Sequence, residues 1–212
     1  DMVVVHVNYT DNPFCPEKSK REAEKCRRND PDAFEHIWMG GYNKNSDAQI
    51  FAGKYVIREF EPKDAWNPLH GLDWGFSQDP TAAVRVYAEN EKLYIYKEAG
   101  KTNLELNDTG KYIRDRIPVV EDYTVRADST RPESINNDKK QYNGLPKIVA
   151  VQKWSGSVED GIKFIRSFDE VVIHPDCVET AQEFRFYKYQ VDKRTGDVTT
   201  KIIDKWNHYI DA

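Results

Sequence analysis

Short apolar segments alternate with helical stretches along this sequence, and that alternation constrains the fold more than any other feature. From residue 67 onward, three strand-like segments come first, at residues 70–75, 82–88 and 92–98. After residue 104, predicted helices and predicted strands take turns. A series of this kind is typical of an α/β domain with a mixed central sheet that is flanked by helices.

The later elements follow from apolar periodicity and turn residues. We predict helices at residues 104–117, 134–141, 157–168 and 177–184, a final helix that begins at His208, and strands at residues 123–127, 148–151 and 171–173. A polar turn at residues 192–197 separates two further predicted strands, 186–191 and 198–203. These two strands predict an added β-hairpin.

The first third of the chain has a different character. We predict a strand at residues 3–9, helices at residues 17–29 and 30–38, and a strand near residues 55–60. We expect residues 1–66 to be a helical connector with a lead-in strand, cut from a longer protein. Residues 67–212 are expected to form the α/β domain.

Charge and cysteine content exclude several classes of protein. The net charge is -5, which is unusual for a general nucleic-acid binder, although a carboxylate metal site adds negative charge by itself. The three cysteines include no C-x-x-C pair, so the sequence contains neither a zinc pattern nor a disulfide framework. This usage fits a reducing compartment. No run of eighteen apolar residues is present, so we expect no membrane-spanning helix.

Two carboxylates follow apolar strand segments. Asp73 ends one of them, and Gly75 after it would leave room for a ligand or a metal beside the backbone. Asp128 follows the predicted strand 123–127 in the same way. An Asp at a strand end is a common site position in α/β folds. Each residue alone fits the role of a turn residue or a helix cap equally well.

The third candidate carboxylate is Asp211, which follows His208 by three residues, so both side chains lie on one face of the predicted final helix. Asp204 is a weaker candidate, because it also fits the end of the hairpin. Three carboxylates can hold Mg²⁺ or Mn²⁺, which prefer oxygen ligands. Two such ions about 4 Å apart activate a water and stabilise the leaving oxygen of a phosphodiester.

Taken in order, these segments resemble the nuclease domain of phage terminase large subunits, which belongs to the ribonuclease-H/RuvC-like superfamily. The resemblance covers nearly the whole chain. It is carried by residues 7–13, residues 34–40, Gly71-Leu72-Asp73-Trp74-Gly75 with Asp79-Pro80-Thr81-Ala82, Ala127-Asp128-Ser129, Lys153 with Gly156-Ser157 and Gly161-Ile162, and Asn207-His208-Tyr209-Ile210-Asp211-Ala212.

The resemblance implies a ribonuclease-H-like fold and a metal-dependent endonuclease that cuts concatemeric double-stranded viral DNA during genome packaging. Asp73, Asp128 and Asp211 are then ligands of Mg²⁺ or Mn²⁺, with two ions expected. His208 is then a catalytic residue that either positions or deprotonates a water, or it holds Asp211 in place.

The implied partners are double-stranded DNA, the portal protein, the small terminase subunit and an ATPase domain of the same full-length chain. No G-x-x-x-x-G-K-[ST] motif is present, so we expect that ATPase domain to be missing here. The implied location is the host cytoplasm and, transiently, the viral procapsid.

Two stretches are locally basic. Residues 184–205 contain six basic and three acidic residues, and residues 131–153 contain five basic and two acidic residues. Such stretches can contact DNA phosphates, although a solvated surface is the alternative. The candidate DNA-binding residues are Lys140, Lys153, Lys188, Lys193, Arg194 and Lys201. No recognition helix for the major groove is evident, so we expect little sequence preference.

Two other functions remain open at this point. Asp73-Trp74-Gly75 also fits the Asp-x-Gly fragment of Mg²⁺-nucleotide-binding proteins with a ribonuclease-H-like fold. The chain can instead be a non-catalytic docking module for the portal or the small terminase subunit. Metal-dependent nicking of DNA distinguishes the nuclease from both alternatives.

Overall fold

The computed structural model describes residues 7–29, 31–40, 48–76, 78–192, 194–203 and 205–212. The chain divides into two compact units, residues 1–48 and residues 49–212. The sequence predicts a boundary between residues 66 and 67. The division lies earlier in the chain because residues 55–57 pair with the sheet of the second unit.

The first unit consists of short helices. It contains a 3-10 turn at Tyr9–Asp11 and the helices α1 (Glu17–Asn29) and α2 (Pro31–Trp38). Both α-helices lie where the sequence predicts them. Tyr9 meets Trp38 edge-on, with ring centroids 5.2 Å apart. The predicted strand at residues 3–9 lies largely outside the described residues, and Tyr9 itself begins the 3-10 turn.

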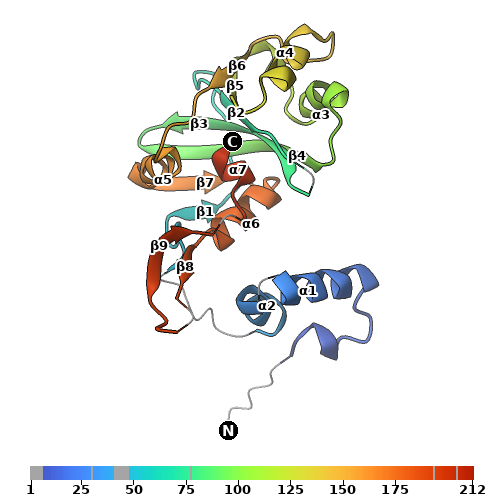
Figure 1. The fold of residues 1–212 in the computed structure, drawn as a ribbon, viewed down its shortest axis with the longest axis vertical. Coiled ribbons are helices and arrows are strands. Elements are labelled where there is room, and N and C mark those ends of the chain that lie inside the picture. Colours follow the sequence, from blue (N-terminus) through green and yellow to red (C-terminus); the bar gives the residue numbers. More distant parts are fainter. Residues whose placement is uncertain (1–6, 30, 41–47, 77, 193, 204) are drawn as a thin grey trace. The chain divides into compact units, whose positions relative to one another are not determined.

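The second unit is built on a sheet in which seven strands are described, in the order β1-β7-β4-β3-β2-β5-β6 (Figure 1). Their bounds are β1 Tyr55–Ile57, β2 Leu69–Asp73, β3 Pro80–Glu89, β4 Lys92–Thr102, β5 Val125–Asp128, β6 Ile148–Val151 and β7 Glu170–Ile173. Strand β3 runs antiparallel to β2 and β4, and the other pairings are parallel. The expected mixed sheet is thereby confirmed.

Helices cover both faces of this sheet (Figure 1). They are α3 Thr109–Arg116, α4 Pro132–Lys140, α5 Ser157–Ser167, α6 Val178–Phe186 and α7 His208–Asp211, with 3-10 turns at Leu106–Asp108 and Val120–Asp122. The predicted helix at residues 104–117 is therefore shorter than expected. The first predicted hairpin strand, at residues 186–191, also begins later than expected, because Phe186 still belongs to α6.

Two apolar clusters hold the layers together. In one, Ile113 of α3 and Ile135 of α4 pack with Leu72 of β2 and Ala127 of β5. In the other, residues from α5 and α6 pack on β4 and β7, and Phe184 is among the most buried of them. Burial of one such side chain contributes about 1.5–3 kcal/mol, so these clusters hold the strand ends at fixed positions.

The added hairpin is also present. It is formed by β8 (Tyr189–Val191) and β9 (Val198–Ile202), which pair antiparallel as a separate sheet. Within the described residues, each helix is too short or too polar to cross a membrane.

Candidate catalytic site

Asp73 and Asp128 end two neighbouring parallel strands. Strand β2 pairs with β5 in the register Leu72↔Ala127, so both carboxylates lie at the same edge of the sheet. Their side chains are largely buried, with exposed fractions of 13% and 9%. The indole Nε1 of Trp74 donates to the carbonyl of Asp128 at 3.0 Å, which links the two strand ends.

The ammonium group of Lys153 lies beside both carboxylates. Its Nζ is 2.7 Å from Asp128 Oδ2 and 3.9 Å from Asp73 Oδ1. Burial alone would raise the pKa of Asp128, but the hydrogen bond from Lys153 and the N–H of Thr130 outweigh it and lower that pKa. Burial would likewise lower the pKa of Lys153, but its bond to Asp128 and the nearby negative charges raise it.

The short helix α7 brings the other two predicted residues to this edge. His208 Nδ1 lies 3.4 Å from Asp73 Oδ2, and His208 Nε2 lies 3.6 Å from Asp79 Oδ1. The hydrogen bond with Asp73 raises the pKa of His208. Asp211 accepts a hydrogen bond from Asn207 Nδ2 at 3.1 Å. Burial, together with the charge of Asp73, raises the pKa of Asp211 to about 6.

Glu183 holds this helix, and the sequence analysis missed it. Its carboxylate accepts the backbone N–H groups of His208 at 3.0 Å, Tyr209 at 2.7 Å and Ile210 at 3.1 Å. These are donors that the first turn of a helix leaves without intrahelical partners. The side chain is almost fully buried, and burial raises the pKa of Glu183 to about 7 despite these bonds. Glu183 thus positions the helix that presents His208 and Asp211.

Gly75 has a role different from the one that the sequence suggests. A Cβ atom at this position would collide with the backbone of Asp79 and Pro80. The Gly75 N–H also donates to Thr81 Oγ1 at 3.1 Å. The chain itself therefore fills the space that we had assigned to a ligand, and glycine is required by the tight β2–β3 connection.

The chemistry of the donors suits a divalent metal ion, whereas their present spacing does not form a complete cage. Buried carboxylate oxygens are ligands that Mg²⁺ and Mn²⁺ accept, and Lys153 shows that this edge attracts a cation. Among the described residues, however, no group of three or more His, Cys, Asp and Glu side chains lies close enough together to hold one ion. Binding an ion between Asp73 and Asp128 requires Lys153 to move away.

The predicted DNA-binding residues are more widely spread. Lys140 lies at the end of α4, Lys188 precedes β8, and Arg194 and Lys201 lie on the hairpin. Lys140, Arg194 and Lys201 are exposed and Lys188 is half-buried. Lys193 and Asp204 lie outside the described residues. Among the described members of this set, Lys153 is the one that contacts the carboxylates of Asp73 and Asp128.

Known proteins resemble this chain in sequence. A family model described as a terminase RNase-H-like domain matches residues 73–212. The terminase large subunit of Bacillus phage SPP1 is 32% identical over an alignment 217 residues long, which covers 99% of this chain and 50% of that protein. The PBSX phage terminase large subunit of Bacillus subtilis strain 168 is 27% identical over an alignment 202 residues long, which covers 89% of this chain and 44% of that protein.

The fold is also similar to a solved structure. The crystal structure of the g2p (large terminase) nuclease domain from bacteriophage SPP1 with bound Mn superposes with a TM-score of 0.65 and 32% identity. The match covers 76% of this chain and 93% of that one. The ribonuclease-H-like mixed sheet expected from the sequence is thereby confirmed. The chain spans about half the length of the two curated relatives.

Proposed function

The chain belongs to the terminase RNase-H-like domain family of phage terminase large subunits, and on that premise we propose that it is a divalent-metal-dependent DNA endonuclease. Its substrate is concatemeric double-stranded viral DNA, which it cuts during genome packaging with little sequence preference. The observation that carries the proposal is the pair of strand-end carboxylates, Asp73 and Asp128, which share the ammonium group of Lys153.

The proposed ligands of Mg²⁺ or Mn²⁺ are Asp73, Asp128 and Asp211, with two ions in the active state. When bound, these ions supply an activated water and neutralise the charge that develops on the phosphate. The neighbouring residues prepare the site. His208 bonds to Asp73 and orients its carboxylate, and Glu183 fixes the helix that carries His208 and Asp211.

Lys153 has a double role in this proposal. In the structure it neutralises the carboxylates that would otherwise repel each other. When the site is loaded, the same ammonium group is free to contact a DNA phosphate next to the one that is cut. Lys140, Lys188, Lys193, Arg194 and Lys201 are proposed to hold the duplex farther from the cut.

The connector to an ATPase domain of the full-length protein, expected at residues 1–66, is proposed to be the first unit, residues 1–48, because residues 55–57 belong to the sheet of the second unit. The proposed partners of that protein are the portal and the small terminase subunit, at the procapsid in the host cytoplasm. The Mg²⁺-nucleotide alternative loses support, because backbone atoms of Asp79 and Pro80 fill the side of Gly75 where a Cβ atom would lie, and the room predicted there for a ligand is absent.

A plasmid-nicking assay in Mn²⁺, Mg²⁺ and EDTA tests the proposal. We expect metal-dependent nicking and linearisation that Asp73→Asn, Asp128→Asn and Asp211→Asn each abolish. Asp115→Asn is the matched control, because Asp115 is an exposed carboxylate of α3 that pairs with Lys111. Thermal unfolding of each variant shows whether the fold survives. Full activity in Asp73→Asn would remove Asp73 from the site, and the absence of nicking in any metal would favour the docking alternative.

A further inference from the structure

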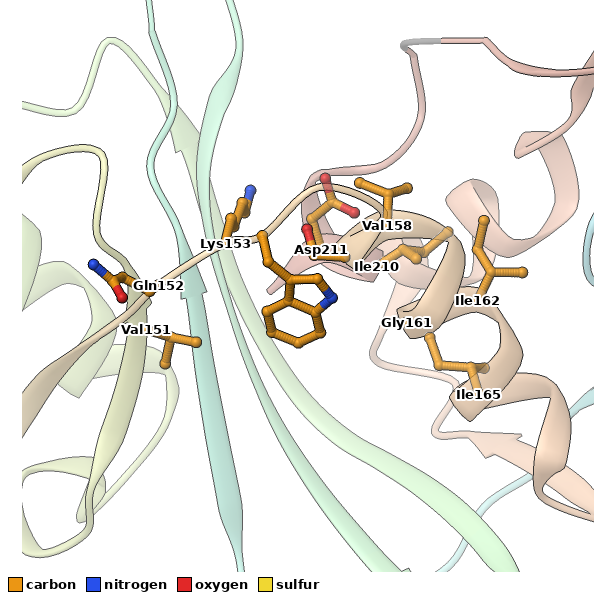
Figure 2. Close-up of a pocket in the computed structure, with 11 residues that line it drawn as sticks. Val151, Gln152, Lys153, Val158, Gly161, Ile162, Ile165, Ile210 and Asp211 are labelled. Carbon is orange, nitrogen blue, oxygen red and sulfur yellow. The ribbon is translucent and has the colours of Figure 1, made fainter.

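A small hollow is lined by Lys153 and Asp211 together with side chains of α5 (Figure 2). Its volume is about 200 Å³, below the roughly 300–1,000 Å³ of pockets for drug-sized ligands, so it suits a single ring system. Apolar side chains of α5 and Ile210 of α7 line part of it. Lys153, Trp154 and Asp211 also line it, so the hollow is continuous with the proposed catalytic site.

Trp154 is exposed, and both its indole N–H and its backbone carbonyl are hydrogen-bonded. Its exposed fraction is 60%, which is high for a large aromatic residue next to a catalytic site. The indole Nε1 donates to Asp160 Oδ2 at 3.2 Å, and the Trp154 carbonyl accepts the N–H of Ser157 at 3.0 Å. Gly156 makes this turn possible with a φ of 89°. Because the polar edge of the indole is satisfied, what it offers a ligand is its apolar ring face.

The chemistry of the hollow favours a neutral planar ligand over an anion. Most of its lining is apolar, as at Val158, Ile162 and Ile210, and in the structure its lysine, Lys153, is paired with Asp128. An apolar floor beside an indole instead matches a nucleobase, because every base has a π-face that can stack on an aromatic ring.

We propose that Trp154 stacks on a nucleobase that has left the duplex stack next to the phosphate that is cut, and so holds that DNA strand against the carboxylates. This inference rests on the proposed nuclease function and adds a base-contacting residue to it. Stacking of one base on an aromatic side chain changes affinity roughly 5- to 150-fold, and it tolerates any sequence. Trp154 therefore positions the strand without creating sequence preference.

Two variants and two oligonucleotides test the stacking. Trp154→Ala removes the ring, whereas Trp154→Phe retains an aromatic face. Phe164→Ala is the matched control, because Phe164 is a comparably exposed aromatic residue of α5, at 63%, that does not line the hollow. Binding is measured by fluorescence anisotropy, in an Asp73→Asn background, to a labelled thymidine oligonucleotide and to an abasic oligonucleotide of the same length.

We expect Trp154→Ala to weaken binding of the thymidine strand by a factor in the range above and to leave binding of the abasic strand unchanged. Trp154→Phe should recover most of the loss, and Phe164→Ala should bind both strands as the parent does. Equal weakening on both strands, or no weakening on either, would overturn the stacking proposal.

The same variants without Asp73→Asn separate the two proposals. If Trp154→Ala slows plasmid cleavage and Trp154→Phe restores it, both the stacking proposal and the nuclease proposal are supported. Normal cleavage by Trp154→Ala together with unchanged binding overturns the stacking and leaves the nuclease standing. A loss of thymidine binding in a protein that never cleaves DNA supports the stacking and contradicts the nuclease.

Discussion

The ammonium group of Lys153 lies 2.7 Å from the Asp128 carboxylate and 3.9 Å from that of Asp73, so one positive charge serves two acidic groups. A divalent ion that binds these carboxylates must compete with this charge. In the proposed nuclease, the metal affinity of the site would therefore be set partly by a residue that is not a ligand. The side chain of Lys153 is 43% exposed, so it has solvent to move into.

Replacing Lys153 by Met should change how metal affects stability. The variant keeps an aliphatic stem but leaves two largely buried carboxylates, Asp73 and Asp128, without their cation, and we expect it to lose about 1–3 kcal/mol of unfolding free energy in EDTA. Mn²⁺ should then raise its Tm more than it raises the Tm of the wild type, because no ammonium group competes. Lys163→Met, which removes an exposed pair with Asp160, is the control. Equal Mn²⁺-induced shifts in wild type and Lys153→Met would contradict this account.

Replacing Glu183 by Gln should displace α7. The amide cannot accept three N–H groups as the carboxylate does, and its own NH₂ group faces backbone donors. We expect a loss of about 2 kcal/mol in unfolding free energy. In addition, the Mn²⁺ concentration for half-maximal nicking should rise, because Asp211 lies on α7. Binding of DNA in EDTA should stay the same.

Glu179→Gln is the matched control for this change, since Glu179 lies on the same helix but is exposed. A purely structural effect of Glu183→Gln would lower stability without altering the Mn²⁺ dependence of nicking below the melting range. That pattern would show that Glu183 stabilises the fold but does not position the site.

The strand-end carboxylates could be predicted because an Asp that follows an apolar run and precedes turn residues is a local pattern. That Asp73 and Asp128 are neighbours could not be derived from the residues, because it depends on the parallel pairing of β2 with β5 across more than fifty residues. The resemblance to a family supplied this proximity. Most helices and strands were placed well, because their periodicity is also local.

Glu183 and Lys153 show what the sequence conceals. Glu183 lies in a helix that also contains Arg185 and Glu179, and a charged residue in such a helix is normally solvated. Only the packing of α7 against α6 turns it into a buried acceptor. Lys153 was predicted to bind DNA, but its contact with Asp128 depends on where β6 ends next to β5.

Asp138 should make stability depend on pH. Its side chain is fully buried in α4, Oδ1 accepts the N–H of Gly110 at 3.1 Å, and Oδ2 has no hydrogen-bond partner among the described residues. Burial raises the pKa of Asp138 to about 6. Because the folded pKa is raised, the stability contributed by this group is fully present below a pH of about 4 and is lost as the pH rises through about 6.

The variant Asp138→Asn removes this titration with little change in shape. We expect Asp138→Asn to be more stable than the wild type at pH 8, by up to about 3 kcal/mol, and the difference to shrink toward pH 4. Urea unfolding of both proteins across this pH range measures it. A difference that does not change with pH would show that Asp138 titrates normally in the folded protein.

The hairpin residues Arg194 and Lys201 should contribute to DNA affinity through charge alone. Both are exposed, and neither lies in the apolar clusters, so each can be replaced by Ala without loss of packing. The logarithm of the affinity falls linearly with the logarithm of the salt concentration. Each phosphate contact that is lost should make this negative slope shallower by about 1, and by the same amount for every DNA sequence. Fluorescence anisotropy with a duplex at several salt concentrations, in an Asp73→Asn background, measures the slope. Lys163→Ala, on α5, is the control. If Arg194→Ala and Lys201→Ala show the same slope as the wild type, the hairpin does not contact the DNA backbone. The basic stretch at residues 184–205 is then a solvated surface.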